Sequence, residues 1–274
     1  MDEILHDLSS ESLIIANEEN LATWLSVFSR LEGALINDIP GVKRTISDIP
    51  LALFNSIMDA RLTPENVDAA IQYIVADGNK RNVPLLWWIG PSTRPPDLAT
   101  YLERYGFSID EDCPGMAAGL DALNESLPVP AGLTITPALS EASRLEWCLA
   151  MAAGFEIPRS KTDFAVDSWQ KLIRLCDPEI TLPYLGKLNE KPVATSLLQL
   201  GGGVAGIYGV ATIPEARRMG IGAQVTLYPL QVARARGYKA GVLEASEMGV
   251  SVYHSLGFRE YCQISSYRWS PTNL

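Results

Sequence analysis

Apolar and polar positions along the second half of the chain predict an alternation of strands and helices. Short apolar runs bounded by glycine and proline predict strands, and longer runs with apolar residues three or four positions apart predict helices. Pro214 ends one strand because proline lacks the N–H of a sheet ladder, and Gly237 closes the helix that follows. The predicted strands are 133–136, 182–188, 192–200, 204–213, 240–245 and 261–269; one helix begins at Ser140 and others cover 163–176, 221–236 and 247–256.

The first half of the chain repeats this order more weakly. Gly106-Phe107 and Gly257-Phe258 each follow a short predicted helix and precede a strand, which indicates a diverged internal duplication. Prolines 128 and 130 mark a linker at 124–132. We therefore expect an α+β (mixed α/β) fold in two domains, 1–127 and 128–274. In the first domain, strands are predicted at 42–46, 51–60, 83–89 and 116–120, and helices at 64–80 and 96–105.

Composition restricts the class of protein. Hydrophobic residues make up 47% and charged residues 20% of the chain, as in a soluble globular protein. The formal net charge is −10; residues 1–128 carry 20 Asp and Glu against 8 Lys and Arg, and 129–274 carry 12 against 14. An acidic half is a poor match for a phosphate backbone, so we expect no nucleic-acid partner. The second half is the better host for an anionic cofactor.

The sequence favours neither a metal site nor a membrane segment. The four cysteines are scattered, without the spacing of a metal site, which favours reduced thiols. With two histidines in the chain, we expect no zinc site. The 23 residues from Pro192 to Pro214 carry no charge, but Gly201-Gly202-Gly203 interrupts them and predicts two strands joined by a turn. The chain shows no signal-peptide pattern, so we expect a soluble, cytoplasmic protein that does not bind membranes.

A candidate anion site lies where the strand 204–213 gives way to the helix 221–236. The connecting residues are Arg217-Arg218-Met219-Gly220-Ile221-Gly222. The start of a helix presents unpaired N–H groups and the positive end of the helix dipole, and both favour a phosphate group. The two glycines allow close approach to the backbone, and the two arginines add positive charge. This pattern predicts a cradle for the pyrophosphate of a nucleotide-like cofactor.

These features resemble the GNAT family, the GCN5-related N-acetyltransferases, over roughly residues 130–274. The resemblance rests on the strand ending Val210-Ala211-Thr212-Ile213-Pro214-Glu215, the loop Arg217-x-x-Gly220-x-Gly222 and the later Tyr253-x-x-x-Gly257-Phe258. It implies two tandem GNAT-like domains, each a mixed, mostly antiparallel sheet flanked by helices. The first would be a degenerate copy, because only Arg61-Leu62-Thr63 precedes its helix at 64–80 and Leu102 takes the place of Tyr253.

The resemblance also implies the site residues. Acetyl-CoA would be the co-substrate, without a metal: its pyrophosphate would bind to the amides of the loop and its pantetheine arm to the strand edge. Tyr253 would be the general acid that protonates the leaving sulfur. The implied cofactor-binding residues are Val210, Ala211, Thr212, Arg217, Arg218, Met219, Gly220, Ile221, Gly222, Ala223 and Ser246.

The general base stays open among Glu244, Glu156 and Glu215. The resemblance implies an acetyl-CoA-dependent N-acetyltransferase that moves an acetyl group directly to a primary amine of a small molecule or peptide. The alternative is an acetyl-CoA-binding regulatory or scaffold protein without turnover, and a third possibility is an enzyme with a non-acetyl acyl donor or a hydroxyl acceptor. A homodimer is left open, and the sequence does not identify the acceptor.

Overall fold

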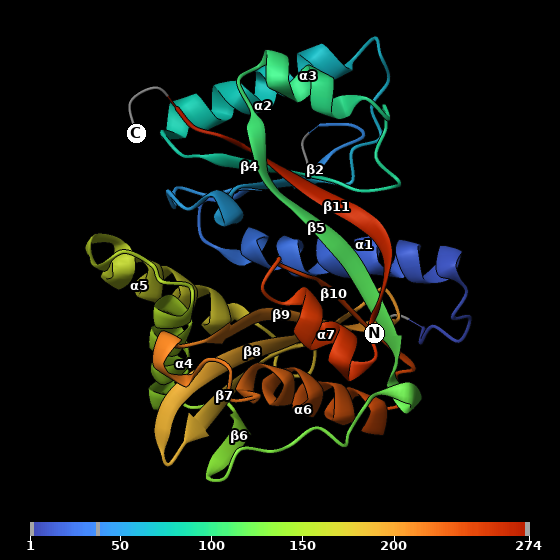
Figure 1. Cartoon of the computed structure of the whole chain (residues 1–274). Coiled ribbons are helices and arrows are strands. Elements are labelled where there is room, and N and C mark those ends of the chain that lie inside the picture. Colours follow the sequence, from blue (N-terminus) through green and yellow to red (C-terminus); the bar gives the residue numbers. More distant parts are fainter. Residues whose placement is uncertain (1–2, 37–38, 272–274) are drawn as a thin grey trace. The chain divides into compact units, whose positions relative to one another are not determined.

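The computed structural model describes residues 3–36 and 39–271, and these form two compact units (Figure 1). Unit 1 combines the chain up to Asn20 with Gly115–Tyr261, and unit 2 combines Leu21–Pro114 with the chain from Cys262 onward. The expected domains, 1–127 and 128–274, are continuous stretches of sequence, so each unit draws residues from both. The internal duplication behind those bounds stays a prediction.

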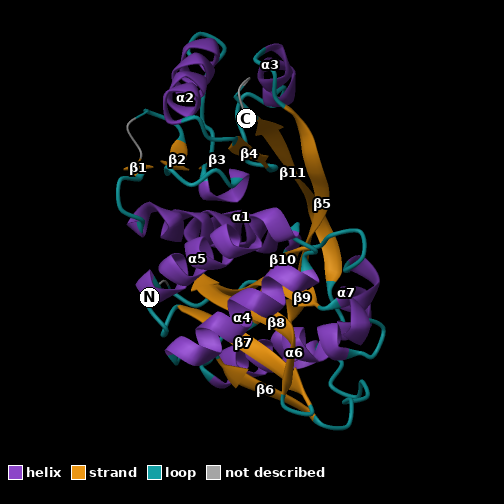
Figure 2. Cartoon of the chain, turned by 90° about the vertical axis from the view of Figure 1, so that its left-hand side faces the viewer, coloured by secondary structure: helices purple, strands orange, loops and turns teal. Residues whose placement is uncertain are grey.

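The sheet of unit 1 has the strand order β5-β10-β9-β8-β7-β6. β10 runs parallel to β9, and the other neighbours in this unit are antiparallel. Figure 2 shows β6, β7, β8 and β9 side by side. The charge-free run is the hairpin of β8 and β9, as expected. The strand bounds are β6 Leu133–Pro137, β7 Thr181–Leu188, β8 Lys191–Gly201, β9 Val204–Thr212, β10 Ala240–Glu244, and residues 115–119 of β5 (Ser108–Gly119).

Helices cover both faces of this sheet. On one face, α6 (Ile221–Ala235) and α7 (Val250–Leu256) enclose the largest apolar cluster of the unit, to which β9 contributes Ala205 and Ile207. On the other face, α1 (Ser10–Ser26) packs Leu13 and Ala16 against a smaller cluster. α4 (Glu141–Gly154) also reaches this sheet, and it pairs with α5 (Arg159–Leu175). Ser140 caps α4, as expected, by accepting a hydrogen bond from the Ser143 amide.

The helix α1 is absent from the sequence-based expectations. Its apolar residues do not form one continuous stripe, because polar side chains such as Asn17 and Asn20 lie on the covered face beside Leu13 and Ala16. A helix whose buried face mixes amide and apolar side chains gives a weak periodic signal. Its first residues, up to Asn20, belong to unit 1.

The sheet of unit 2 has the order β1-β2-β3-β4-β11-β5. The unit holds residues 262–269 of β11 and 108–114 of β5, which the bidentate ion pair of Arg268 with Asp110 joins. α2 (Val67–Arg81) and α3 (Leu98–Arg104) belong to it. Its strands are β1 Leu35–Ile36, β2 Lys43–Ile46, β3 Ser56–Met58, β4 Leu85–Ile89 and the parts of β5 and β11 (Arg259–Trp269) just named.

Two expectations for unit 2 need correction. The strand expected over 51–60 is a 3-10 helix at Ala52–Phe54 followed by β3 alone. The reason is Asn55, a buried residue whose amide donates to the carbonyls of Ile49 and Leu51 and thereby holds the chain in a turn. The helix expected from Pro64 begins at Val67.

The mixed, mostly antiparallel sheets with flanking helices confirm the expected α+β fold class. None of the helices in the described ranges is long and apolar enough to cross a membrane. All four cysteines carry free thiols, and burial raises the pKa of the Cys148 thiol to about 12.

Candidate functional site

The loop before α6 presents a run of backbone N–H groups that the protein does not use. Arg217 N–H donates to the Pro214 carbonyl, and the first helical bond of α6 runs from Gln224 N–H to the Gly220 carbonyl. Between them, the amides of 218–223 have no hydrogen-bond acceptor within the described part of the chain. Gly220, at φ 80°, and Arg218, at φ 62°, bend the backbone through the left-handed region. Successive amides in such a bend converge on one point and suit an anion.

Gly220 and Gly222 contribute in different ways. The left-handed φ of Gly220 is costly for a residue with a Cβ. At Gly222, an added Cβ would find its nearest atom, Thr212 Oγ1, at 3.8 Å, which is an ordinary contact, so a side chain fits there. Because Gly222 is itself one of the residues with an unpaired amide, a longer side chain at 222 would extend from the first turn of the helix next to these amides.

Arg217 and Arg218 are placed differently from each other. The Arg217 guanidinium donates to the carbonyls of Thr212 at 3.2 Å and Gly154 at 2.9 Å, and to the Glu156 carboxylate at 2.9 Å. It thereby fastens the end of β9 to the end of α4, and its Nε and one of its two terminal nitrogens are used inside the protein. Arg218 is exposed, and no hydrogen bond or ion pair of its side chain is seen among the described residues. Arg218 is therefore the cation of the loop that a ligand can reach.

The strand β9 has an unpaired edge next to this loop. On one side, Ala211 and Thr212 pair with Thr195 and Ala194 of β8. On the other side, β10 pairs with β9 only at Ala205 and Gly206, so from 207 to 212 the edge that faces away from β8 has no strand partner among the residues that the structure describes. Val210, Ala211 and Thr212 lie on this segment. An unpaired strand edge can bind an extended, amide-containing chain as an additional strand.

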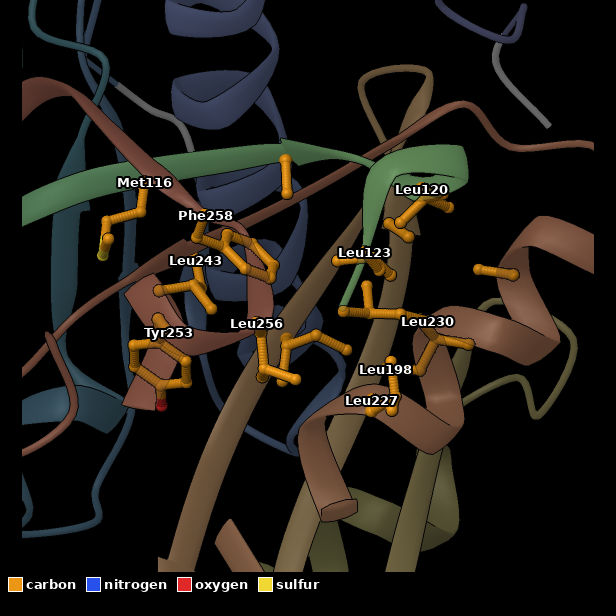
Figure 3. Packing of buried hydrophobic residues seen from close by; sticks show 14 of the residues in the cluster. Met116, Leu120, Leu123, Leu198, Leu227, Leu230, Leu243, Tyr253, Leu256 and Phe258 are labelled. Carbon is orange, nitrogen blue, oxygen red and sulfur yellow. The ribbon is translucent and has the colours of Figure 1, made fainter. Parts of the chain in front are cut away.

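Tyr253 lies on α7, and its ring belongs to the large apolar cluster that α6 and α7 enclose on one face of the unit 1 sheet. The residue is 8% exposed, and its ring packs against Phe258 at a centroid distance of 6.1 Å. Figure 3 shows the ring beside Leu243 and the hydroxyl oxygen directed away from the cluster. Burial, with a smaller contribution from the negative charge of Glu244, raises the pKa of Tyr253 to about 12. The phenol is therefore protonated at neutral pH and can act as a proton donor.

Ser246 follows β10 and is exposed. Its carbonyl accepts hydrogen bonds from the amides of Gly249 and Val250, so its backbone closes the first turn of α7.

Glu244, the last residue of β10, differs from the other two candidate bases. Its Oε1 is fully buried and has no hydrogen-bond partner. Burial raises the pKa of Glu244 to about 8. By contrast, Glu156 is paired with Arg217, and Glu215 is exposed. A carboxyl group with a raised pKa and one buried oxygen without a partner, beside a buried tyrosine, is typical of proton-transfer chemistry.

The sequence analysis missed Tyr208 on β9. Burial and the nearby charge of Glu244 raise the pKa of Tyr208 well above that of an ordinary tyrosine. Its hydroxyl donates to Asn20 Oδ1 of α1 at 2.8 Å. No motif contains Tyr208, and without α1 nothing in the sequence distinguishes it from a strand residue.

Comparison with known proteins agrees with the resemblance. Residues 146–258 match the family model described as acetyltransferase (GNAT) family. No curated protein matches the chain. A GCN5-related N-acetyltransferase from Kribbella flavida has the same fold, with a TM-score of 0.69, 19% identity and 98% of each chain covered. A functionally unknown conserved protein from Staphylococcus epidermidis gives a TM-score of 0.67 at 12% identity, covering 88% of this chain and 96% of that one.

A tandem GNAT protein from the clavulanic acid biosynthesis pathway also shares the fold. Its TM-score is 0.60 at 12% identity, with 95% of this chain and 93% of that chain covered. These identities are low, so the likeness concerns the fold. It extends over both halves of the chain.

Proposed function

We propose, on the basis of the match of residues 146–258 to the GNAT acetyltransferase family model, that this protein transfers the acetyl group of acetyl-CoA directly to a primary amine of a small molecule or peptide. The observation that carries the proposal is the run of unpaired amides at 218–223. The start of a helix leaves its first four N–H groups without a helical partner, and the longer run at 218–223, bent through the left-handed region at Arg218 and Gly220, favours an anionic ligand.

The residues around the loop fit the parts of acetyl-CoA. The amides of 218–223 would bind the pyrophosphate, with Arg218 adding charge. The β9 edge at 210–212 would pair with the amides of the pantetheine arm. That arm would bring the thioester toward the end of β10, where Glu244 and Tyr253 lie on either side of the strand.

Glu244 and Tyr253 divide the proton transfers between them. Acetyl-CoA supplies the activated acetyl group when it is bound. Ionised Glu244 removes one proton from the acceptor's ammonium group, which leaves the nitrogen lone pair free to form the new C–N bond. Tyr253 would give its proton to the sulfur as the C–S bond breaks, and the second proton that the nitrogen must lose to become an amide would return the tyrosine to its neutral form. Since Glu244 acts in its ionised form, turnover should rise with pH toward a plateau above about pH 8.

The two steps assist each other electrostatically. The charge of Glu244 contributes to the raised pKa of Tyr253. Once Glu244 has accepted its proton, that charge is gone and the tyrosine becomes a stronger acid. The base therefore prepares the acid for the step that follows.

The first half of the chain does not offer a second cofactor site of this kind. At the position of the missing glycine loop, the amides of Arg61 and Leu62 donate to the carbonyls of Gly41 and Arg94, and the Thr63 amide donates to Asn66 Oδ1. All three N–H groups are thus used by the protein. This contrast with 218–223 supports a degenerate copy that shapes or stabilises the protein without binding acetyl-CoA.

Gly222→Asp tests the proposal. The new carboxylate would lie next to the unpaired amides and repel a pyrophosphate, so we expect the Kd for CoA to rise at least 100-fold by isothermal titration calorimetry, which corresponds to about 2.7 kcal/mol. The matched control is Thr63→Asp, which adds the same charge at the corresponding position of the first half and should leave the affinity unchanged. Wild-type protein that fails to bind CoA at millimolar concentration, or Gly222→Asp protein that binds it normally, would refute the site.

A further inference from the structure

The α1-covered face of the unit 1 sheet holds a group of polar side chains. Ala240 and Val242 of β10 pack against α1 on this face, and because side chains alternate along a strand, Glu244 lies on it too. On β9, the same alternation from Val204 places Gly206 and Tyr208 there. Asn20 lies directly over Gly206, since a Cβ added to that glycine would meet Asn20 Oδ1 at 1.9 Å. The glycine thus admits an asparagine from α1 to the sheet surface.

Asn20 determines how α1 lies on the sheet. Its amide nitrogen lies within hydrogen-bond distance of three carbonyl oxygens, those of Gln199, Gly201 and Val204. Its Oδ1 accepts the hydroxyl proton of Tyr208. Exchanging the amide N and O would set an oxygen against three oxygens, so the orientation is unambiguous. With Asn20 held in this way, Asn17, one turn earlier on the same helix face, also faces the sheet.

Asn17 and Glu244 each have a buried oxygen without a donor. Asn17 Nδ2 donates to the Met116 carbonyl at 3.4 Å, but Asn17 Oδ1 has no partner, and neither has Glu244 Oε1. Asn17 lies over Met116 of β5, and the neighbouring Gly115 pairs with Glu244 across the sheet, so the two residues are placed at the same end of adjacent strands. Gly115 has no side chain to separate them. Two neighbouring buried acceptors without donors are rare in proteins and favour a ligand rich in donors.

We propose that Asn17 Oδ1 and Glu244 Oε1 together bind the primary ammonium group of the acceptor, so that α1 takes part in acceptor selection. This inference rests on the proposed function for the acceptor's role as substrate. A primary ammonium group has three N–H donors and a positive charge, which match one amide oxygen and one carboxylate oxygen. The other titratable groups coupled to Glu244 are Tyr208 and Tyr253, neutral phenols at neutral pH that do not compete as cations.

The proposed ammonium site gives Asn17, which lies outside 146–258, a direct role toward the acceptor. Asn17 holds the nitrogen beside Glu244, and one N–H proton then passes to Oε1, leaving a neutral amine and a neutral carboxyl group. A hydroxyl group has one donor and no charge, and a quaternary ammonium has no N–H donor at all. The site therefore selects primary amines over both.

The test uses n-butylammonium chloride as the probe and tetramethylammonium chloride as its donor-free counterpart. Both are titrated at equal ionic strength at pH 9, where Glu244 is mostly ionised and an alkylamine is mostly protonated. Binding is measured as the shift of the thermal midpoint of the full-length protein. We expect butylammonium to stabilise the wild-type protein and tetramethylammonium to have no comparable effect. For Asn17→Leu, which keeps the size but removes the acceptor, the apparent Kd for butylammonium should rise at least tenfold.

Two further variants complete the design. Glu11→Gln, which removes an exposed carboxylate from the same helix, should bind butylammonium like the wild type. Asn17→Ala removes the same acceptor oxygen with a smaller side chain and should weaken butylammonium binding in the same way, so it replaces the leucine variant if that variant does not fold. Wild-type protein that does not distinguish the two cations, as expected if water alone fills the site, overturns the inference. So does unchanged binding in the position-17 variants.

CoA affinity, measured in parallel, keeps the two proposals separate. We expect Asn17→Leu to bind CoA with wild-type affinity, because the loop at 218–223 is intact. A protein that selects butylammonium but binds no CoA would refute the acetyltransferase proposal and leave the ammonium site standing. A protein that binds CoA but does not select butylammonium would refute the ammonium site and leave the acetyltransferase proposal standing.

Discussion

At the scale of single residues, burial changes the acid–base properties of Glu244 and Tyr253, the two residues proposed to transfer protons. Glu244 Oε1 and the Tyr253 hydroxyl have no hydrogen-bond partner among the described residues, and burial raises both pKa values. The proposed base, Glu244, ends β10, and the proposed acid, Tyr253, lies on α7, the helix that follows. A single substitution at either residue therefore tests its proposed role directly.

Replacing Tyr253 by phenylalanine removes the proposed proton donor and keeps the ring packed against Phe258. We expect kcat to fall by roughly 10²- to 10³-fold, the range typical of a lost general acid, with the Kd for CoA within about twofold of wild type. The measurement is the release of free CoA thiol from acetyl-CoA with a panel of primary amines. An unchanged kcat would make Tyr253 a structural residue. Absence of turnover with every amine in the wild type, despite tight acetyl-CoA binding, would favour the regulatory or scaffold alternative.

The raised pKa of Glu244 predicts a pH-dependent stability that Glu244→Gln removes. Below about pH 4.5 the carboxyl group is protonated in both the folded and the unfolded states, and its contribution is fully present. As the pH rises to about 8, the unfolded state ionises first, so the wild type loses stability relative to the glutamine variant. The gap should reach a few kcal/mol and level off above pH 8, since each pKa unit corresponds to about 1.36 kcal/mol.

Urea unfolding at intervals between pH 4 and pH 9 measures this gap. Glu11→Gln, at an exposed position, is the control and should follow the wild type at every pH. A gap that does not change with pH would show that the Glu244 carboxyl group is not buried in the folded protein.

At the scale of elements, α6 contains a proline, and the neighbouring strand supplies the hydrogen bond that this proline removes from the helix. Pro229 has no N–H, so the carbonyl of Val225, four residues earlier, lacks its helical partner. The Ser196 hydroxyl of β8 donates to that carbonyl instead. Ser196 is fully buried, so this bond connects helix and sheet inside the protein, away from the surface. The proline thus frees an acceptor that fastens α6, and with it the loop at 218–223, to β8.

Ser196→Ala should therefore destabilise the protein by about 1–3 kcal/mol, because it leaves the Val225 carbonyl buried without a donor. In a Pro229→Ala background, the restored N–H of residue 229 can satisfy that carbonyl, so the same serine change should cost much less. A double-mutant cycle of the unfolding free energy measures the difference. Equal costs in the two backgrounds would show that the hydroxyl and the proline are independent.

At the scale of the whole molecule, the unit that carries the candidate site is not a continuous stretch of sequence. The GNAT match begins at 146, but Leu13 and Ala16 of α1 and Ala117 of β5 cover Val204, Ala240 and Val242 on its sheet. A fragment that starts at the expected domain boundary would expose this apolar face and remove the pairing of β5 with β10.

We expect a fragment of residues 128–274 to lack a cooperative thermal transition and to bind no CoA. The control fragment joins residues 1–20 to 115–261 through a flexible glycine–serine linker in place of 21–114, and should unfold cooperatively because it keeps every segment of unit 1. Circular dichroism during heating, with CoA titration, distinguishes the two. A well-folded, CoA-binding 128–274 fragment would show that the sheet does not need α1 and β5.

The order of elements in the second half could be predicted because its signals are local. Pro214 and Gly237 end elements through their own backbone chemistry, and the strands around 201–203 follow from a glycine turn. The predicted bounds of helices and strands were less accurate where they depend on hydrogen bonds or packing of buried side chains. The buried Asn55 replaced an expected strand by a 3-10 helix, and no periodic pattern revealed α1.

The amino-acid sequence by itself determined the glycine loop, the family resemblance and the position of Tyr253, because these depend on residue types at fixed spacings along one stretch of chain. Only the tertiary structure decided that Arg217 is hydrogen-bonded within the protein, that Glu244 Oε1 is buried without a partner, and that Asn17 and Asn20, 224 and more positions away in the sequence, lie on the same face of the sheet. The physical reason is that burial and hydrogen-bond partners are properties of neighbours in space. A side chain's pKa and its unmet hydrogen bonds exist only once distant segments have packed against it.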